Sequence, residues 1–150
     1  MTAARPSTPR EARDAIEAAA EAILADAASR DRQLLGARVR SIAWATVDLE
    51  RAERELGTAL GVVLDSAPAP RDVELGARAR IARPFGEIPA LVLLEPDTEG
   101  RLAAILARHG EGVAAVTVAA GGQMRRLVLT SGPGGRPPTA PGVRPPSPAE

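Results

Sequence analysis

The sequence contains no cysteine, which excludes disulfide bonds, thiolate metal sites and a cysteine nucleophile. Large aromatic side chains are almost absent, since Trp44 and Phe85 are the only two. The core must therefore be built from Leu, Ile, Val and Ala, and a surface that stacks nucleic-acid bases on aromatic rings is not expected. Lysine is absent too, and the formal net charge is zero. This balance argues against a basic surface for nucleic acid or anionic lipid.

Long apolar runs are also missing. No window of the sequence approaches the roughly 18 consecutive apolar residues of a membrane-spanning helix, and no apolar segment follows the first residues as it would in a secretory signal. We therefore expect a cytoplasmic protein that has no membrane partner. With 150 residues, the chain can bury a single core.

Composition divides the chain into three zones. Residues 1–37 contain an Ala-rich helix, expected over 8–35, which opens with a capping box at Thr8 and Glu11. Residues 38–131 are expected to form the folded domain. Residues 132–150 hold seven of the fourteen prolines, which predicts a disordered tail.

The N-terminal helix has a thin apolar stripe. We expect it to pack on the domain, with pairing to a second copy of itself as the alternative. The stripe consists of Ala12, Ile16, Ala19, Ile23 and Ala27.

The domain is expected to be α+β, because strand and helix patterns alternate along it. A strand leads to Asp48, which is placed to cap a helix that ends near Gly61. Gly121 and Gly122 mark the last turn. The expected strands are 39–47, 62–64, 74–83, 90–95, 113–119 and 126–130, with an Ala-Pro-Ala-Pro loop after the second, a turn at 84–89 and a second helix over 101–108.

Three segments carry a family resemblance: the strand and helix start from Ser41 to Glu50, the strand 91–96, and the run 102–116 with its Gly-Glu-Gly turn. Together they resemble the vicinal oxygen chelate, or glyoxalase-like, superfamily, and methylmalonyl-CoA epimerases in particular. The resemblance implies a βαβββ module. It also implies a second such module, with a divalent cation held by His, Gln and Glu side chains in the cleft between the curled sheets.

The resemblance breaks at the metal site and in the second module, which stops after its first strands. The three ligand positions that can be aligned are Ser41, Val92 and Ala115, and none of these side chains is a strong metal ligand. No metal, cofactor or catalytic residue is therefore expected. Alternation along the strands places Ile42 and Trp44 toward the core and Val113 on the cleft face. The predicted cleft lining is Ser41, Ala43, Ala45, Val92, Leu94, Ala115 and Thr117.

Other polar residues have plain structural interpretations. His109 is expected at the end of the second helix, and Asp97 or Thr98 is expected to cap that helix within the acidic run 95–99. Arg78, Arg80 and Arg83 are expected on a solvated strand face, with an anion site for coenzyme A phosphates or an acidic partner as the alternative. The pair at 125 and 126 is interpreted in the same way.

The sequence therefore predicts a glyoxalase-like domain that works by binding. One version is a homodimer, or a subunit of a paralogous glyoxalase-fold partner, in which another chain covers an exposed apolar cleft face. A second version holds a small apolar ligand, or an acyl-CoA, in the cleft. The alternative is a methylmalonyl-CoA epimerase-like metalloenzyme whose ligands are completed by a second chain.

Overall fold

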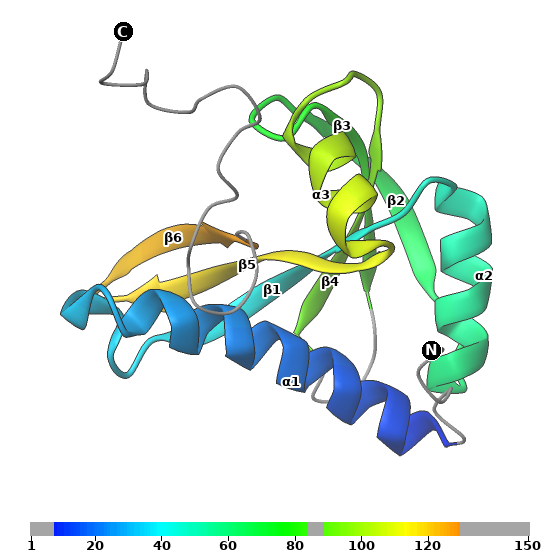
Figure 1. Ribbon diagram of the computed structural model, residues 1–150. Coiled ribbons are helices and arrows are strands. Elements are labelled where there is room, and N and C mark those ends of the chain that lie inside the picture. Colours follow the sequence, from blue (N-terminus) through cyan, green and yellow to red (C-terminus); the bar gives the residue numbers. More distant parts are fainter. Residues whose placement is uncertain (1–7, 84–88, 130–150) are drawn as a thin grey trace, which may run out of the picture.

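The computed structural model describes residues 8–83 and 89–129, and the tail and most of the turn at 84–89 lie outside these ranges. Its helices are α1 (Pro9–Ala28), α2 (Leu49–Leu60) and α3 (Arg101–His109), with a short 3-10 helix, η1 (Arg32–Leu34). None of these helices is long and apolar enough to span a membrane. The helices α1 and α2 lie on one side of the sheet and α3 lies on the other (Figure 1).

Six strands form one mixed sheet in the order β2-β3-β4-β1-β5-β6. They are β1 (Arg38–Ala45), β2 (Asp65–Asp72), β3 (Ala77–Arg83), β4 (Ala90–Pro96), β5 (Gly112–Ala120) and β6 (Gln123–Val128). The strands β1 and β4 are parallel, and every other neighbouring pair is antiparallel. The predicted α+β class and the order strand, helix, three strands are confirmed.

The helix starts follow from their caps. Thr8 Oγ1 accepts a hydrogen bond from Glu11 N at 3.1 Å, and Asp48 Oδ1 accepts one from Arg51 N at 3.1 Å. The predicted end of α1 is wrong, because the helix stops at Ala28. Asp31 Oδ1 accepts from Gln33 N at 2.9 Å and starts η1, so a local side-chain bond replaces the helical ladder. The helix packs on β5, with Ala12, Ile16, Ala20, Ile23 and Leu24 buried.

The second strand also differs from the prediction. The expected strand at 62–64 and the loop after it are replaced by β2, which runs through Pro68 and Pro70. Proline supplies no backbone N–H to a ladder, so it is confined to positions where none is needed. The strand β2 lies at the edge of the sheet and pairs only with β3, which is why it tolerates both prolines.

Much of the cleft face is buried, contrary to the sequence prediction, although Val92 is only partly buried. Ala45, Leu94 and Ala115 have at most 1% of their surface exposed. They belong to a small core that also contains Leu75 and Leu102, the latter from α3. A larger core lies between the other sheet face and the helices α1 and α2. The premise that this whole face is an open apolar patch is therefore wrong, and the dimer stays a prediction.

A β-bulge changes the face of one residue. Ala43 pairs with Ala115, but Trp44 pairs with Val113, so Ala114 is an extra residue in β5. Val113 consequently packs against the larger core, as Trp44 does, and not on the predicted cleft face. Strand alternation cannot anticipate this, because a bulge interrupts the period of two.

Candidate functional site

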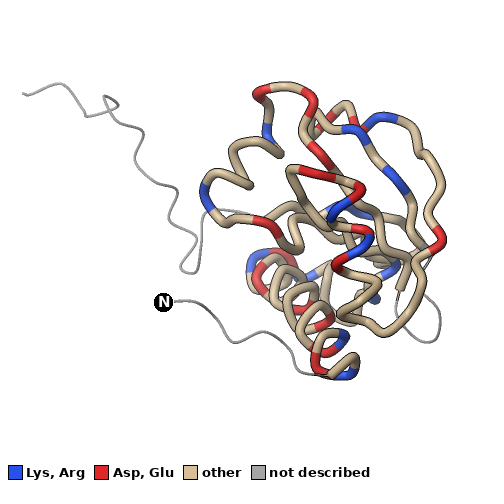
Figure 2. The backbone as a smooth tube through the Cα atoms, turned by 90° about the vertical axis from the view of Figure 1, so that its right-hand side faces the viewer, with Lys and Arg blue, Asp and Glu red and all other residues tan. Residues whose placement is uncertain are grey.

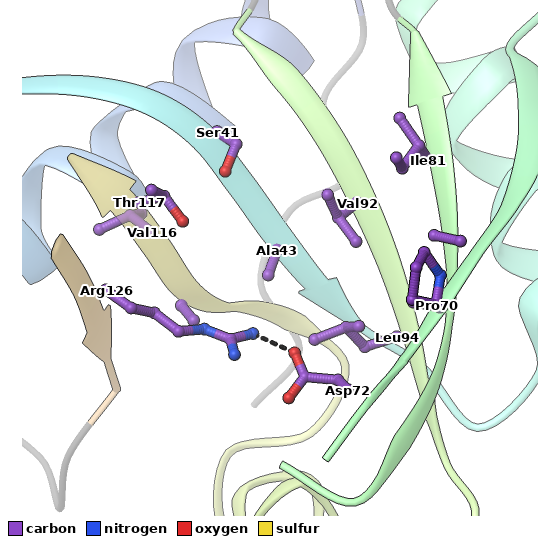
Figure 3. Close-up of a pocket in the computed structure, with 13 residues that line it drawn as sticks. Ser41, Ala43, Pro70, Asp72, Ile81, Val92, Leu94, Val116, Thr117 and Arg126 are labelled. Carbon is purple, nitrogen blue, oxygen red and sulfur yellow. Dashed lines mark hydrogen bonds and ion pairs between the residues drawn. The ribbon is translucent and has the colours of Figure 1, made fainter. Parts of the chain in front are cut away.

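A small cavity lies on the sheet face away from α1 and α2, and we call it the sheet pocket (Figure 3). Its volume is about 210 Å³. Ala45 does not line it. The predicted cleft residues that do line it are Ser41, Ala43, Val92, Leu94, Ala115 and Thr117, and Ala69, Pro70 and Asp72 of β2, Ala79 and Ile81 of β3, Val116 of β5 and Arg126 of β6 complete the wall.

An ion pair closes one side of the sheet pocket. Arg126 Nη2 binds Asp72 Oδ2, and its Nη1 lies 3.1 Å from Glu74 Oε1. Burial raises the pKa of Asp72, but the hydrogen bonds from Arg126 and from Leu75 N outweigh it and hold the pKa below its ordinary value. Burial lowers the pKa of Arg126, but Asp72 and Glu74 outweigh it and raise the pKa.

Sequence reasoning missed Asp72. Arg126 was noted, but its partner lies 54 residues away and on a strand that was expected to be a loop. No local pattern links the two residues, because only the curl of the whole sheet brings its two outer strands together.

The sheet pocket does not fit a divalent cation. The three positions that could be aligned with metal ligands, Ser41, Val92 and Ala115, all line it. Its only carboxylate, Asp72, is held by Arg126. A hard cation needs several oxygen or nitrogen ligands, and one engaged carboxylate with two hydroxyls is too few. Among the residues that the structure describes, no three His, Cys, Asp or Glu side chains gather as a metal site.

The arginines of β3 already face carboxylates. Arg78 forms an ion pair with Glu95, and Arg80 Nε lies 3.8 Å from Glu53 Oε2. The side chain of Arg83 lies outside the described part of the structure. At Arg78 an anion would have to compete with Glu95, whereas the buried Nε of Arg80 has no hydrogen-bond partner among the described residues, so the anion-site alternative stays untested. Arg125 likewise pairs with Asp31 at 2.7 Å.

The acidic run at 95–99 separates into different contacts. Glu95 Oε1 accepts from Leu49 N at 3.1 Å, at the start of α2. Asp97 forms a two-point pair with Arg71 at 2.6 and 2.8 Å, and this hydrogen bonding lowers its pKa. The helix α3 starts after Gly100 with no side-chain cap, so the predicted cap at 97 or 98 is wrong. His109 is the exposed last residue of that helix.

A second and larger cavity opens between α1 and α2, and we call it the helix groove. Its volume is about 910 Å³. The two helices approach one another at one end, where a Cβ on Gly61 would lie 3.0 Å from Pro9 Cγ. Trp44 of the sheet below lines the groove and is only partly buried. The groove walls carry Ala12, Ala15, Ile16 and Ala19 of α1, and Ala52, Arg54, Glu55, Leu56, Thr58 and Ala59 of α2.

Glu111 anchors the start of α2 at one end of the helix groove. Its Oε2 accepts from Thr46 Oγ1 and Val47 N, both at 3.0 Å, and from Arg51 Nη2. Burial raises the pKa of Glu111, but these three hydrogen bonds outweigh it and the pKa lies below its ordinary value. The sequence analysis assigned Trp44 to the core and missed this groove, because an Ala-rich helix stripe is typical of close packing.

Charges of both signs are interspersed over the described chain, including along α1 (Figure 2). In that view, no large area of the chain carries charges of one sign alone. Individual charged residues must therefore be interpreted from their own partners.

No protein-family model matches the chain, and no curated protein sequence matches it. Solved structures similar to it include the methylmalonyl-CoA epimerase from Mycobacterium tuberculosis, with 22% identity over 55% of this chain and 54% of that chain and a TM-score of 0.47. A Streptomyces coelicolor methylmalonyl-CoA epimerase in complex with 2-nitronate-propionyl-CoA has 26% identity over 53% of this chain and 57% of that chain, with a TM-score of 0.43. A hypothetical protein from Bacillus halodurans has 17% identity over 55% of this chain and 57% of that chain, with a TM-score of 0.45.

Two of these three structures are methylmalonyl-CoA epimerases, the proteins that the sequence motifs resemble. The chain spans little more than half the length of each of them. At these TM-scores the likeness carries no conclusion about what this chain binds or catalyses.

Proposed function

We propose that this chain is a non-catalytic subunit that pairs with a second chain through strand β6. The two edges of the sheet differ, and this difference carries the proposal. Edge strand β2 contains Pro68 and Pro70, which block backbone pairing. Edge strand β6 contains no proline, and its outer side has no partner within residues 8–83 and 89–129.

The backbone groups available on β6 follow from its hairpin. The two-residue turn at Gly121 and Gly122 makes Ala120 and Gln123 a hydrogen-bonded pair, so pairs alternate from there along the strand. The N–H and C=O groups of 124, 126 and 128 therefore face outward. A copy related by a two-fold axis satisfies them with its own β6. A paralogous glyoxalase-fold chain is the alternative partner.

The small size of the sheet pocket favours a subunit role over a protein that binds a ligand in the cleft and over a metalloenzyme. Its volume of about 210 Å³ is below the roughly 300 Å³ at which small-molecule sites begin, which disfavours the cleft as a site for an apolar ligand or an acyl-CoA. An epimerase-like alternative would need its metal ligands and its base from the second chain, because the sheet pocket offers one carboxylate, and Arg126 occupies it.

Proline substitution tests the β6 pairing directly. Met124→Pro removes an outward N–H, so the single chain should still fold, whereas pairing to another β6 should be lost. We expect light scattering at micromolar concentration to report a dimer for the wild type and a folded monomer for Met124→Pro, with the melting temperature lowered only by the loss of association.

The matched control is Met124→Gln, which keeps the N–H at the same exposed position and should remain dimeric. A monomeric wild type, or a dimer that tolerates Met124→Pro, would contradict homodimerisation through β6.

A further inference from the structure

We propose that the helix groove binds a flat apolar molecule with one anionic group, which stacks on Trp44 and places its anion on Arg54 and Thr58. This site lies on the helix side of the sheet, away from the sheet pocket, and it goes beyond the proposed pairing through β6.

The shape of the groove fits a small molecule. The helices α1 and α2 approach one another at Pro9 and Gly61 and diverge from that point along the sheet (Figure 1). Protein cores are normally packed without voids of this size. The void remains here because the two helices present small residues to the groove, among them Ala15 and Ala59. The volume of about 910 Å³ is within the range of ligand pockets, which runs from roughly 300 to 1,000 Å³.

The floor of the groove favours an aromatic or otherwise flat body. Trp44 is the largest side chain of the lining and is only partly buried. A partly exposed indole in a concave apolar site favours a planar ring packed against it.

The charge that remains available to a ligand in the groove lining is that of Arg54, which favours an anion. Arg51 forms ion pairs with both carboxylates of the lining. Its Nη1 lies 3.2 Å from Glu55 Oε1, and its Nη2 binds Glu111 Oε2. Arg54 has no carboxylate partner among the described residues. Thr58 lies one turn further along α2, so the two side chains are neighbours on one helix face. A guanidinium and a hydroxyl on one wall together provide charge-assisted donors for a carboxylate or sulfonate.

Trp44 is the only tryptophan and the chain has no tyrosine, so intrinsic fluorescence reports on the groove alone. The test titrates the full chain with anilinonaphthalene sulfonate, an aromatic anion whose naphthalene ring is flat. We expect saturable one-to-one binding, with quenching of Trp44 emission and energy transfer to the probe. Ala15→Glu and Ala19→Glu, each exposed and in the groove wall, should weaken binding at least tenfold.

Two controls separate the groove from general surface binding. Ala18→Glu places the same charge on an exposed position of α1 outside the lining, and it should leave the affinity unchanged. Arg54→Gln should weaken the anionic probe about tenfold, which corresponds to about 1.4 kcal/mol, and leave binding of neutral N-phenylnaphthylamine unaltered. Melting curves establish that each variant is folded.

Three results would overturn the proposal. The first is probe binding that leaves Trp44 emission unchanged. The second is equal affinity of the groove and Ala18→Glu variants. The third is dissociation of a dimer by Ala19→Glu without loss of probe binding, which would assign the groove to a second copy of the chain.

Discussion

Arg126 of β6 and Asp72 of β2 form an ion pair across the concave face of the sheet, although their strands are the two outermost of the six. The Asp72 side chain is only 13% exposed. Leu75 N donates to its other oxygen at 2.9 Å, so the carboxylate is also tied to the turn before β3. The pair therefore joins the edges of the sheet and closes the side of the sheet pocket.

Loss of the Arg126 guanidinium should destabilise the fold. We expect Arg126→Gln to lower the free energy of unfolding by about 1–3 kcal/mol, because it leaves a largely buried carboxylate without its charged partner. Urea denaturation at neutral pH measures the change. The control is Arg101→Gln, whose 3.4 Å pair with Glu74 is more than half exposed on both sides and should change stability by less than about 1 kcal/mol. Equal effects of the two variants would mean that the ion pair across the sheet does not stabilise it.

Acid should weaken the folded state through two carboxyl groups. Asp72 and Glu111 have folded-state pKa values below their ordinary values of 3.8 and 4.5. The unfolded chain therefore binds protons first, so this stabilisation is complete above those values and is lost as the pH falls below them. Urea midpoints measured from about pH 6 to about pH 3 should fall, and Glu111→Gln should show a smaller fall than the wild type. An unchanged pH dependence in that variant would contradict the role of Glu111.

Local signals in the sequence account for much of the fold. The caps at Thr8 and Asp48 and the stop at Gly61 were predictable, because each depends on one side chain or one φ angle near a helix end. The Gly121-Gly122 turn and the two strands around it were predictable for the same reason. Six of the seven predicted cleft residues do meet around the sheet pocket, all except Ala45, because β1 pairs with β4 on one side and with β5 on the other.

Features that depend on distant pairing were not predictable. A strand containing Pro68 and Pro70 is acceptable only at an edge, and the edge is known only once the sheet is assembled. The bulge at Ala114 moves Val113 to the other face with no local signal. The helix groove escaped notice because it depends on the angle between α1 and α2, which the apolar stripe of either helix does not fix.

The close approach of α2 to the turn that follows it, at Val62, should make Gly57 irreplaceable. A Cβ at this position would lie 2.8 Å from the carbonyl oxygen of Val62, a backbone atom that cannot rotate away. Alanine gains up to about 1 kcal/mol of helix propensity over glycine, but we expect the clash to exceed it and Gly57→Ala to destabilise by about 1–3 kcal/mol. Thermal or urea unfolding measures this. The neighbouring Thr58→Ala, on the exposed side, should stay within about 0.5 kcal/mol of the wild type, and a stabilised Gly57→Ala would refute the packing argument.

Retention of a divalent metal should be far below one ion per chain. The sheet pocket offers hydroxyls from Ser41 and Thr117 and one carboxylate, Asp72, which already binds Arg126. Binding a metal there would require that ion pair to break and would still leave most of the coordination sphere to water. The test exposes purified protein to cobalt or zinc and then desalts it. Elemental analysis measures the metal that is retained. Arg126→Gln is the companion variant, because it frees the Asp72 carboxylate. If the shortage of ligands prevents metal binding, this variant should also retain far less than one ion per chain. Stoichiometric metal in the wild type that is lost on Asp72→Asn would instead show that the pocket is a metal site and would restore the epimerase-like alternative.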